Sequence, residues 1–156
     1  MDTYCKSALN QIGICVQTVV EIMRNLTEDD LLRRPTPNKY SVGELLEHLA
    51  TICEADWKIS NEATWEEMDE YYATLSYKTI QEIERGLFQN YESLIGNYRN
   101  LSEADLQTTT TSYWGVRYTR YEWLLEIVAH MYHHSGQLHA MMVHVLGKDP
   151  QIMLFE

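Results

Sequence analysis

Apolar residues recur at intervals of three and four positions over four long stretches of the chain, which is the pattern of amphipathic helices. The helices are predicted over residues 5–25, 41–59, 80–98 and 119–147. Each stretch is long enough to bury one face along its whole length, so the helices are expected to pack side by side. Four such helices in a chain of 156 residues predict an all-α fold, an antiparallel four-helix bundle.

Signals for helix starts and stops support these boundaries. Two segments, Ser41-Val42-Gly43-Glu44 and Thr119-Arg120-Tyr121-Glu122, are capping boxes, in which a hydroxyl and a carboxylate satisfy the free amides of a first turn. The prolines at 35 and 37 deny helical backbone to the residues before them, and they separate the first helix from the second. Gly147 is expected to end the last helix.

The remaining segments lack a long helical stripe. Residues 61–72 are acidic and have few apolar positions, so they are expected to form a short exposed helix or a loop. Residues 108–117 are rich in threonine, tyrosine and tryptophan, which predicts an extended or hairpin connection before the last helix. The whole chain, residues 1–156, is expected to form a single domain.

Charge and composition exclude several classes of protein. With 23 acidic and 12 basic residues the net charge is −11, which disfavours nucleic acid and anionic lipid as partners. No apolar run reaches the roughly 18 residues of a membrane span, and the first residues do not resemble a signal peptide, so a cytoplasmic protein is expected. Cys5, Cys15 and Cys53 form no CxxC pair and are expected to be buried as small apolar residues.

Histidines cluster on the last predicted helix, which carries five of the six. His130 and His134 are four residues apart, about 40° around a helix, so both can reach one metal ion from the edge of the apolar stripe. His133 and His139 point in other directions. His144 lies about 15 to 20 Å further along the helix, too far to share that ion.

His48 has the same position, at the edge of the apolar stripe of the second helix. If the two helices face each other, His48, His130 and His134 converge and leave coordination positions free, the pattern of a catalytic metal site. Nitrogen ligands without thiolates suit zinc, nickel, iron or copper. The alternative is that the three histidines are ordinary polar residues at helix edges.

Residues near the predicted ligands have two interpretations each. Glu44 and Glu126 lie one turn before His48 and His130, and Gln137 lies close to the face of the pair, so each is a candidate to orient an imidazole. The alternative is that they are surface residues, and the capping box already accounts for Glu44.

Two segments carry a family resemblance. His130-Met131-Tyr132-His133-His134-Ser135-Gly136-Gln137-Leu138 resembles the His-x-x-His-His-Arg-Gly-Gln motif in the last helix of the DinB/YfiT-like superfamily, with Ser135 in place of the usual arginine. The segment from Ser41 to Ala50 resembles the second-helix motif that carries the first ligand of that family. The resemblance covers nearly the whole chain.

The resemblance implies a four-helix bundle, a homodimer, and one divalent metal ion per chain held by His48, His130 and His134. Zinc is the first expectation and nickel the second. Related members include thiol-dependent S-transferases and isomerases and proteins described as metal-dependent hydrolases. The metal would therefore activate either water or a small-molecule thiol toward a small-molecule substrate.

The connection before the last helix is expected to shape the mouth of the pocket through Tyr113, Trp114, Arg117 and Tyr118. Arg117 is a candidate to meet an anionic substrate or the carboxylate of a thiol; otherwise it is a surface arginine. Our functional hypothesis is a metal-dependent S-transferase or hydrolase. The alternative is a non-catalytic dimeric module that binds a metal or ligand, because no general acid or base stands out in the sequence.

Overall fold

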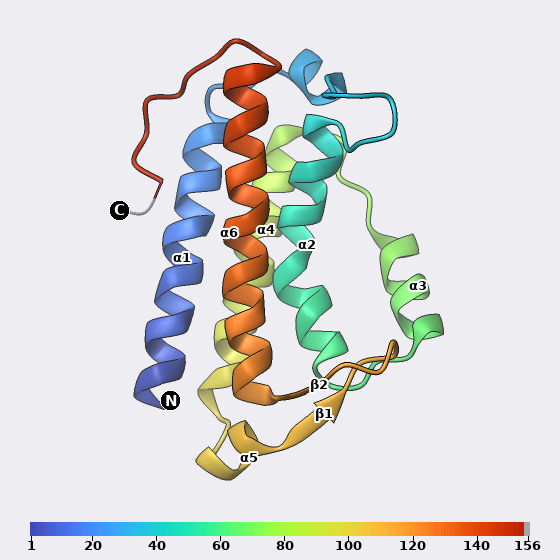
Figure 1. Ribbon diagram of the computed structural model, residues 1–156, viewed down its shortest axis with the longest axis vertical. Helices are drawn as coiled ribbons and strands as arrows, with labels where there is room; N and C mark the ends of the chain where they lie inside the picture. The colour runs from blue at the N-terminus through green and yellow to red at the C-terminus, as the bar shows by residue number, and fades with distance from the viewer. Residues whose placement is uncertain (155–156) are drawn as a thin grey trace.

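The computed structural model describes residues 1–154, and four long helices lie along its main axis (Figure 1). They are α1 (Thr3–Met23), α2 (Val42–Ile59), α4 (Ile80–Arg99) and α6 (Arg120–His144). The predicted all-α bundle is thus confirmed, with boundaries close to those expected. Three short helices join them, η1 (Glu28–Leu32), α3 (Trp65–Thr74) and α5 (Glu103–Gln107), of which η1 and α5 were not predicted because each is a single short turn.

Side-chain caps define where the helices begin. The Ser41 amide donates to Glu44 Oε2 at 2.6 Å, and the Glu44 amide donates to Ser41 Oγ at 3.1 Å, so the predicted capping box is present. Thr119 and Glu122 make the equivalent pair of bonds at the start of α6. These reciprocal bonds satisfy amides that a helix leaves free at its first turn.

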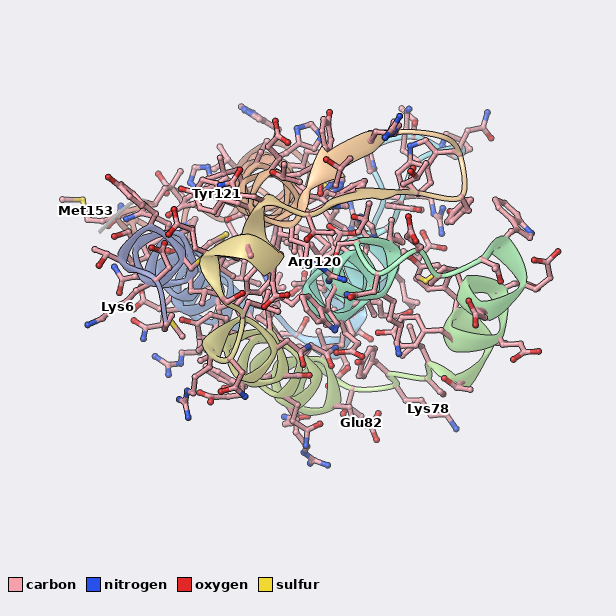
Figure 2. The ribbon with its side chains drawn as sticks, turned by 90° about the horizontal axis from the view of Figure 1, so that it is seen from below. Lys6, Lys78, Glu82, Arg120, Tyr121 and Met153 are labelled. Atoms are coloured by element: carbon pink, nitrogen blue, oxygen red, sulfur yellow. The ribbon has the colours of Figure 1, made fainter. Side chains whose placement is uncertain are left out.

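Two pairs of long helices that follow each other in the sequence, α1 with α2 and α4 with α6, lie across the bundle from one another, whereas α2 and α4 are neighbours. α1 packs against α4 and α6, and α2 packs against the same two helices, so α1 and α2 lie on one diagonal. The view along the axis shows this ring, with α3 outside it beside α2 (Figure 2). Because residues 60–79 return the chain to the end where α2 began, α4 runs parallel to α2, whereas α6 runs antiparallel to it (Figure 1).

The apolar faces of the four long helices meet in one continuous core. Its fully buried members come from every long helix, and they include Ile12, Leu49, Leu94, Ile127 and Leu138. Burying such a side chain contributes roughly 1.5–3 kcal/mol. The three cysteines are buried and unpaired, as expected. No helix among residues 1–154 has the length and apolar character that a membrane span requires.

A two-stranded hairpin precedes α6, as predicted for this threonine-rich segment. β1 (Thr109–Thr111) pairs antiparallel with β2 (Arg117–Thr119) in a register that sets Thr110 opposite Tyr118. Gly115 permits the turn because its φ is +92°, a region that side chains disfavour. The Trp123 indole donates to Thr110 Oγ1 at 2.9 Å and so fastens the hairpin to α6.

Two helical glycines should respond in opposite ways to alanine. A Cβ at Gly13 would meet the Tyr91 ring, whose Cζ lies 3.0 Å away, and would disturb the bond from the Tyr91 hydroxyl to the Leu9 carbonyl. We expect Gly13→Ala to destabilise the protein by about 1–3 kcal/mol. Gly96→Ala, which meets no atom within 4 Å, should stabilise it by about 0.5–1 kcal/mol. Urea unfolding measures both, and equal effects would contradict the packing described.

Candidate metal centre

Three imidazoles from two neighbouring helices converge at the middle of the bundle wall. His48 Nε2 on α2 lies 3.1 Å from His130 Nε2 and 3.1 Å from His134 Nε2, both on α6. Suitable ligand atoms of the three residues all lie within 4.8 Å of one another. All three side chains are half-buried, so the site is shielded and still accessible. The structure therefore brings together the three histidines selected from the sequence.

The outer nitrogens of two of these rings are held by neighbouring side chains. His130 Nδ1 lies 2.8 Å from Asp56 Oδ2, and His134 Nδ1 lies 2.7 Å from Gln137 Oε1. Both partners are oxygen acceptors, so each Nδ1 carries the proton and each Nε2 keeps a lone pair. The lone pairs point at the convergence point. This is the arrangement that orients histidine ligands in metal sites.

The donor set fits a cation better than it fits hydrogen bonds alone. A proton on His48 Nε2 can be donated to only one of the two neighbouring Nε2 atoms, so one lone pair is left without a donor. A metal ion between the rings would accept the lone pairs of all three Nε2 atoms. Zinc–nitrogen bonds of about 2.0–2.1 Å in a tetrahedron place nitrogens about 3.3 Å apart, close to the observed spacing.

The protonation of two of the three rings, His48 and His134, favours metal binding. Burial, together with the charges of His134 and His130, lowers the pKa of His48 to about 4. Burial also lowers the pKa of His134, although its bond to Gln137 opposes this. Burial opposes the charged form of His130 too, but Asp56 and then Glu126 raise its pKa overall. His48 and His134 are thus neutral near pH 7, as metal binding requires, and Asp56 strengthens His130 as a donor.

Asp56 is the residue of this site that the sequence analysis missed. Its side chain is 11% exposed, and it comes from α2, eight residues after His48 and about 80° around the helix. The signal was available, because an acidic residue between Ala55 and Ile59 interrupts an otherwise apolar face. A buried carboxylate needs a partner, and His130 is that partner.

Glu126 lies close to Asp56 and also to the ring of His130, the imidazole that it was predicted to orient. Suitable ligand atoms of Asp56, Glu126 and His130 lie within 4.8 Å of one another. Burial, followed by the charge of Asp56, raises the pKa of Glu126 to about 7. Glu44 belongs to its capping box and forms an ion pair with Arg34 at 3.3 Å, so it does not orient His48.

The hairpin residues predicted at the pocket mouth separate into two groups. Trp114 and Tyr113 line a cavity of about 240 Å³ together with His48, His130 and the two carboxyl groups. Tyr118 instead packs its ring on Trp123, with centroids 5.0 Å apart. Arg117 is exposed on β2 and is not among the residues that line this cavity.

The other histidines stay outside the cluster, as the helical angles predicted. His133 is exposed, and its Nε2 lies 3.1 Å from Gln137 Nε2, so the amide of Gln137 bridges two histidines. His139 and His144 do not belong to the group of ligand atoms that meet at His48.

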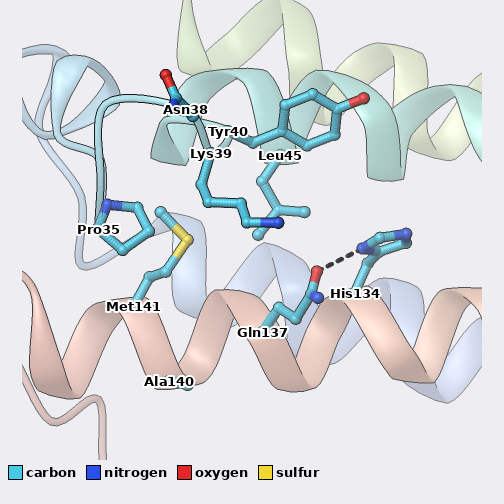
Figure 3. A pocket seen from close by; sticks show the side chains of 9 residues that line it. All are labelled: Pro35, Asn38, Lys39, Tyr40, Leu45, His134, Gln137, Ala140 and Met141. Atoms are coloured by element: carbon cyan, nitrogen blue, oxygen red, sulfur yellow. Dashed lines mark hydrogen bonds between the residues drawn. The ribbon is translucent and has the colours of Figure 1, made fainter.

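Two further cavities adjoin the histidines. One of about 550 Å³ lies between α6 and the loop before α2 and is lined by His134 (Figure 3). Another of about 510 Å³ lies between α2 and α3 and is lined by His48. The metal centre is thus open on several sides.

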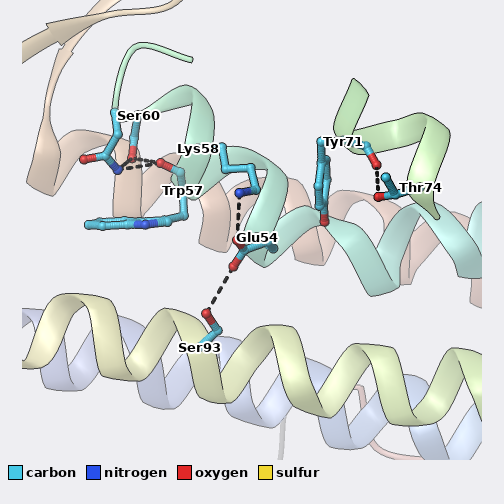
Figure 4. A network of polar contacts seen from close by, with 8 residues as sticks. Glu54, Trp57, Lys58, Ser60, Tyr71, Thr74 and Ser93 are labelled. Atoms are coloured by element: carbon cyan, nitrogen blue, oxygen red, sulfur yellow. Dashed lines mark hydrogen bonds and ion pairs between the residues drawn. The ribbon is translucent and has the colours of Figure 1, made fainter. Parts of the chain in front are cut away.

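A fourth cavity, of about 570 Å³, lies away from the histidines on the other side of α2. Several polar groups pair with one another: Lys58 Nζ lies 3.3 Å from Glu54 Oε1, and Ser93 Oγ donates to Glu54 Oε2 at 3.1 Å (Figure 4). Among residues 1–154 the buried Tyr71 hydroxyl on the wall of this cavity has no hydrogen-bond partner, but no titratable cluster accompanies it, and we assign no site to this cavity.

The fold and the three converging imidazoles define a helical-bundle protein with a three-histidine cluster that could hold a metal ion. The sequence pattern of the DinB superfamily matches residues 12–138, so the chain belongs to that superfamily. Ser135, where the related motif usually has arginine, is buried; burial raises the pKa of the Cys15 thiol to about 11, although Ser135 lowers that pKa. No curated protein matches the sequence.

Solved structures agree with this assignment. A crystal structure described as a DinB family protein from Exiguobacterium sibiricum is 31% identical, with 99% of both chains covered and a TM-score of 0.85. DinB-like proteins from Bacillus subtilis and Bacillus cereus are 15% and 16% identical, with TM-scores of 0.74 and 0.72. The match to the Bacillus subtilis protein covers 96% of this chain and 98% of that protein's chain. The match to the Bacillus cereus protein covers 95% of this chain and 97% of that protein's chain. These two show the shared fold.

Replacing Asp56 should weaken the metal centre without removing a ligand. In Asp56→Asn the neutral amide no longer supports the charge on His130, so we expect zinc affinity to fall about 10- to 100-fold. Competition with a chromophoric chelator measures this, and circular dichroism checks the fold. Asp69→Asn on the exposed side of α3 is the matched control. Equal affinities in the two variants would contradict a supporting role for Asp56.

Proposed function

We propose that this protein is a divalent-metal-dependent enzyme in which His48, His130 and His134 hold one metal ion per chain, zinc first and nickel second. The observation that carries the proposal is the convergence of three Nε2 atoms, two of them oriented by Asp56 and Gln137. Three protein ligands leave at least one position for substrate, which distinguishes catalytic from structural zinc sites. Bound there, the metal would lower the pKa of water or a thiol so that a nucleophile exists at neutral pH.

The protein's own residues complete such a site. Asp56 and Gln137 hold the ligand rings in one orientation and one tautomer. Glu126, with a pKa raised to about 7 by burial and by Asp56, is placed in the 240 Å³ cavity to give or take a proton during turnover. Trp114, Trp123 and Tyr72 line the same cavity with aromatic rings. The setting we propose is cytoplasmic.

The reaction class stays open between thiol transfer and hydrolysis. Both use the same activated nucleophile, and the substrate that reaches the cavities decides between them. A small-molecule substrate suits the size of these cavities, since ligand pockets of about 300–1,000 Å³ are typical.

A second candidate function is a dimeric binding module without turnover. Exposed aromatic residues favour it: Trp65 is 63% exposed and Trp114 is 53% exposed, and both contact the ring of Tyr113. Aromatic residues are enriched at protein interfaces, so this group of rings suits a second copy of the chain as well as a pocket wall.

Metal content tests the first part of the proposal. Untagged protein should contain about one transition-metal equivalent per chain, and His48→Ala should lose it, because two histidines hold a metal poorly. At free zinc about 100-fold above Kd, binding stabilises the folded state by about 2.7 kcal/mol, which raises Tm by about 5–10 °C. Elemental analysis and thermal melts with and without chelator measure both effects. Protein that stays metal-free after zinc or nickel is supplied would make the histidines structural.

Turnover separates the enzyme from the binding module. Metal-loaded protein should catalyse thiol conjugation or ester or amide hydrolysis in a substrate screen, and His130→Ala should abolish that activity. His139→Ala, on the same helix but outside the cluster, should leave it unchanged. If the loaded protein binds metal and turns over nothing in the screen, the module is the better description.

A further inference from the structure

The cavity beside His134 has the character of a ligand pocket. Its volume of about 550 Å³ falls in the range for small-molecule sites, and most of its wall is apolar. It is formed by the loop before α2, by α2 and by the second half of α6 (Figure 3). Its lining includes Lys39, Leu45, His134, Gln137, Ala140 and Met141.

Lys39 is the cationic side chain in this lining, and its ammonium group has no acidic partner within the described part of the chain, residues 1–154. Among residues 1–154, Lys58 pairs with Glu54, Lys148 pairs with Asp30, and no carboxylate lies within ion-pair distance of Lys39. In a protein with a net charge of −11, an unpaired cation beside an apolar cavity is a distinctive feature. The side chain runs along the cavity in the direction of His134 (Figure 3).

The backbone that carries Lys39 is held in place. Its amide donates to the Thr36 carbonyl at 3.2 Å, and its carbonyl accepts from Arg34 Nη1 at 2.9 Å. Arg34 is in turn paired with Glu44 at the start of α2. The loop therefore presents Lys39 at a defined place. The charge of Arg34 is neutralised by its ion pair with Glu44.

The polar groups that line the cavity differ in their chemistry. Lys39 supplies one positive charge, and His134 with Gln137 borders the metal centre. The neighbouring amides at the start of α2 are occupied by the Ser41–Glu44 capping box, and the Glu44 carboxylate adds negative charge there. One ammonium group without free helix amides matches a singly charged carboxylate better than a phosphate.

We propose that this cavity binds a small aliphatic carboxylate, with its carboxylate on Lys39, its chain against Leu45, and its reacting end at the metal centre beside His134. The assignment of a reacting end rests on the proposed function, whereas binding of the carboxylate does not. This gives Lys39 the role in anion recognition that the sequence suggested for Arg117, which lies on the hairpin and does not line this cavity.

Calorimetric titration of zinc-loaded protein with mercaptohexanoate and mercaptohexanol tests the proposal. The two probes share a thiol and an apolar chain and differ in the charged end. We expect Lys39→Met to weaken mercaptohexanoate about fivefold, the effect of one partly exposed ion pair, and to leave mercaptohexanol unchanged. Lys6→Met on the exposed side of α1 is the matched control and should change neither. Equal effects on both probes, or no effect on either, would overturn the assignment.

A second variant tests the location. Ala140 is exposed on α6 at the edge of the cavity, so Ala140→Trp should fill the cavity, leave the core intact and weaken both probes at least tenfold. Unchanged binding in this variant would place the carboxylate elsewhere.

Metal-free protein separates this proposal from the proposed function. Hexanoate, which has no thiol, should bind the metal-free protein and lose about fivefold in Lys39→Met. If the protein binds no metal but hexanoate still depends on Lys39, only the proposed function fails. If zinc binds and neither carboxylate depends on Lys39, only the carboxylate pocket fails.

Discussion

The antiparallel contact between α2 and α6 is the interaction on which the rest of this structure depends. Each helix buries an apolar face in the common core, and each carries its metal-ligand candidates at the edge of that face. Burial of Leu45, Leu49, Ile127 and Leu138 therefore sets the distance at which His48 meets His130 and His134. A shift of α6 along α2 by one helical turn, about 5.4 Å, would separate the imidazole rings. The packing of the core therefore also fixes the geometry of the site.

The site also places polar groups where a bundle of this kind is otherwise apolar. Asp56 and Glu126 stand between Ile52, Ile59 and Trp123, and taking carboxyl groups out of water costs free energy unless they are paired. Asp56 is paired with His130, and the raised pKa of Glu126 lets it hold a proton near neutral pH. Such a group of coupled acids and imidazoles is typical of functional sites, where stability is given up for chemistry.

Access to the centre comes from segments outside the four long helices. The hairpin supplies Trp114 on one side, α3 supplies Tyr72, and the loop before α2 supplies Lys39 on the side of His134. The bundle supports the three histidines, and these connections line the cavities beside them. This division agrees with the general tendency of loops to carry specificity on a fixed scaffold.

Local properties of the chain were predictable from the sequence. Helix boundaries, the capping boxes at Ser41 and Thr119, the hairpin and the shared face of His130 and His134 all depend on residues within one or two turns. The tertiary structure alone decided the ring order of the helices, the partnership of Asp56 with His130, and which cation lies beside the centre. These contacts join residues that are far apart in the sequence. They depend on how the apolar faces pack and on how residues 60–79 return the chain along the bundle. Neither can be predicted from a local sequence pattern.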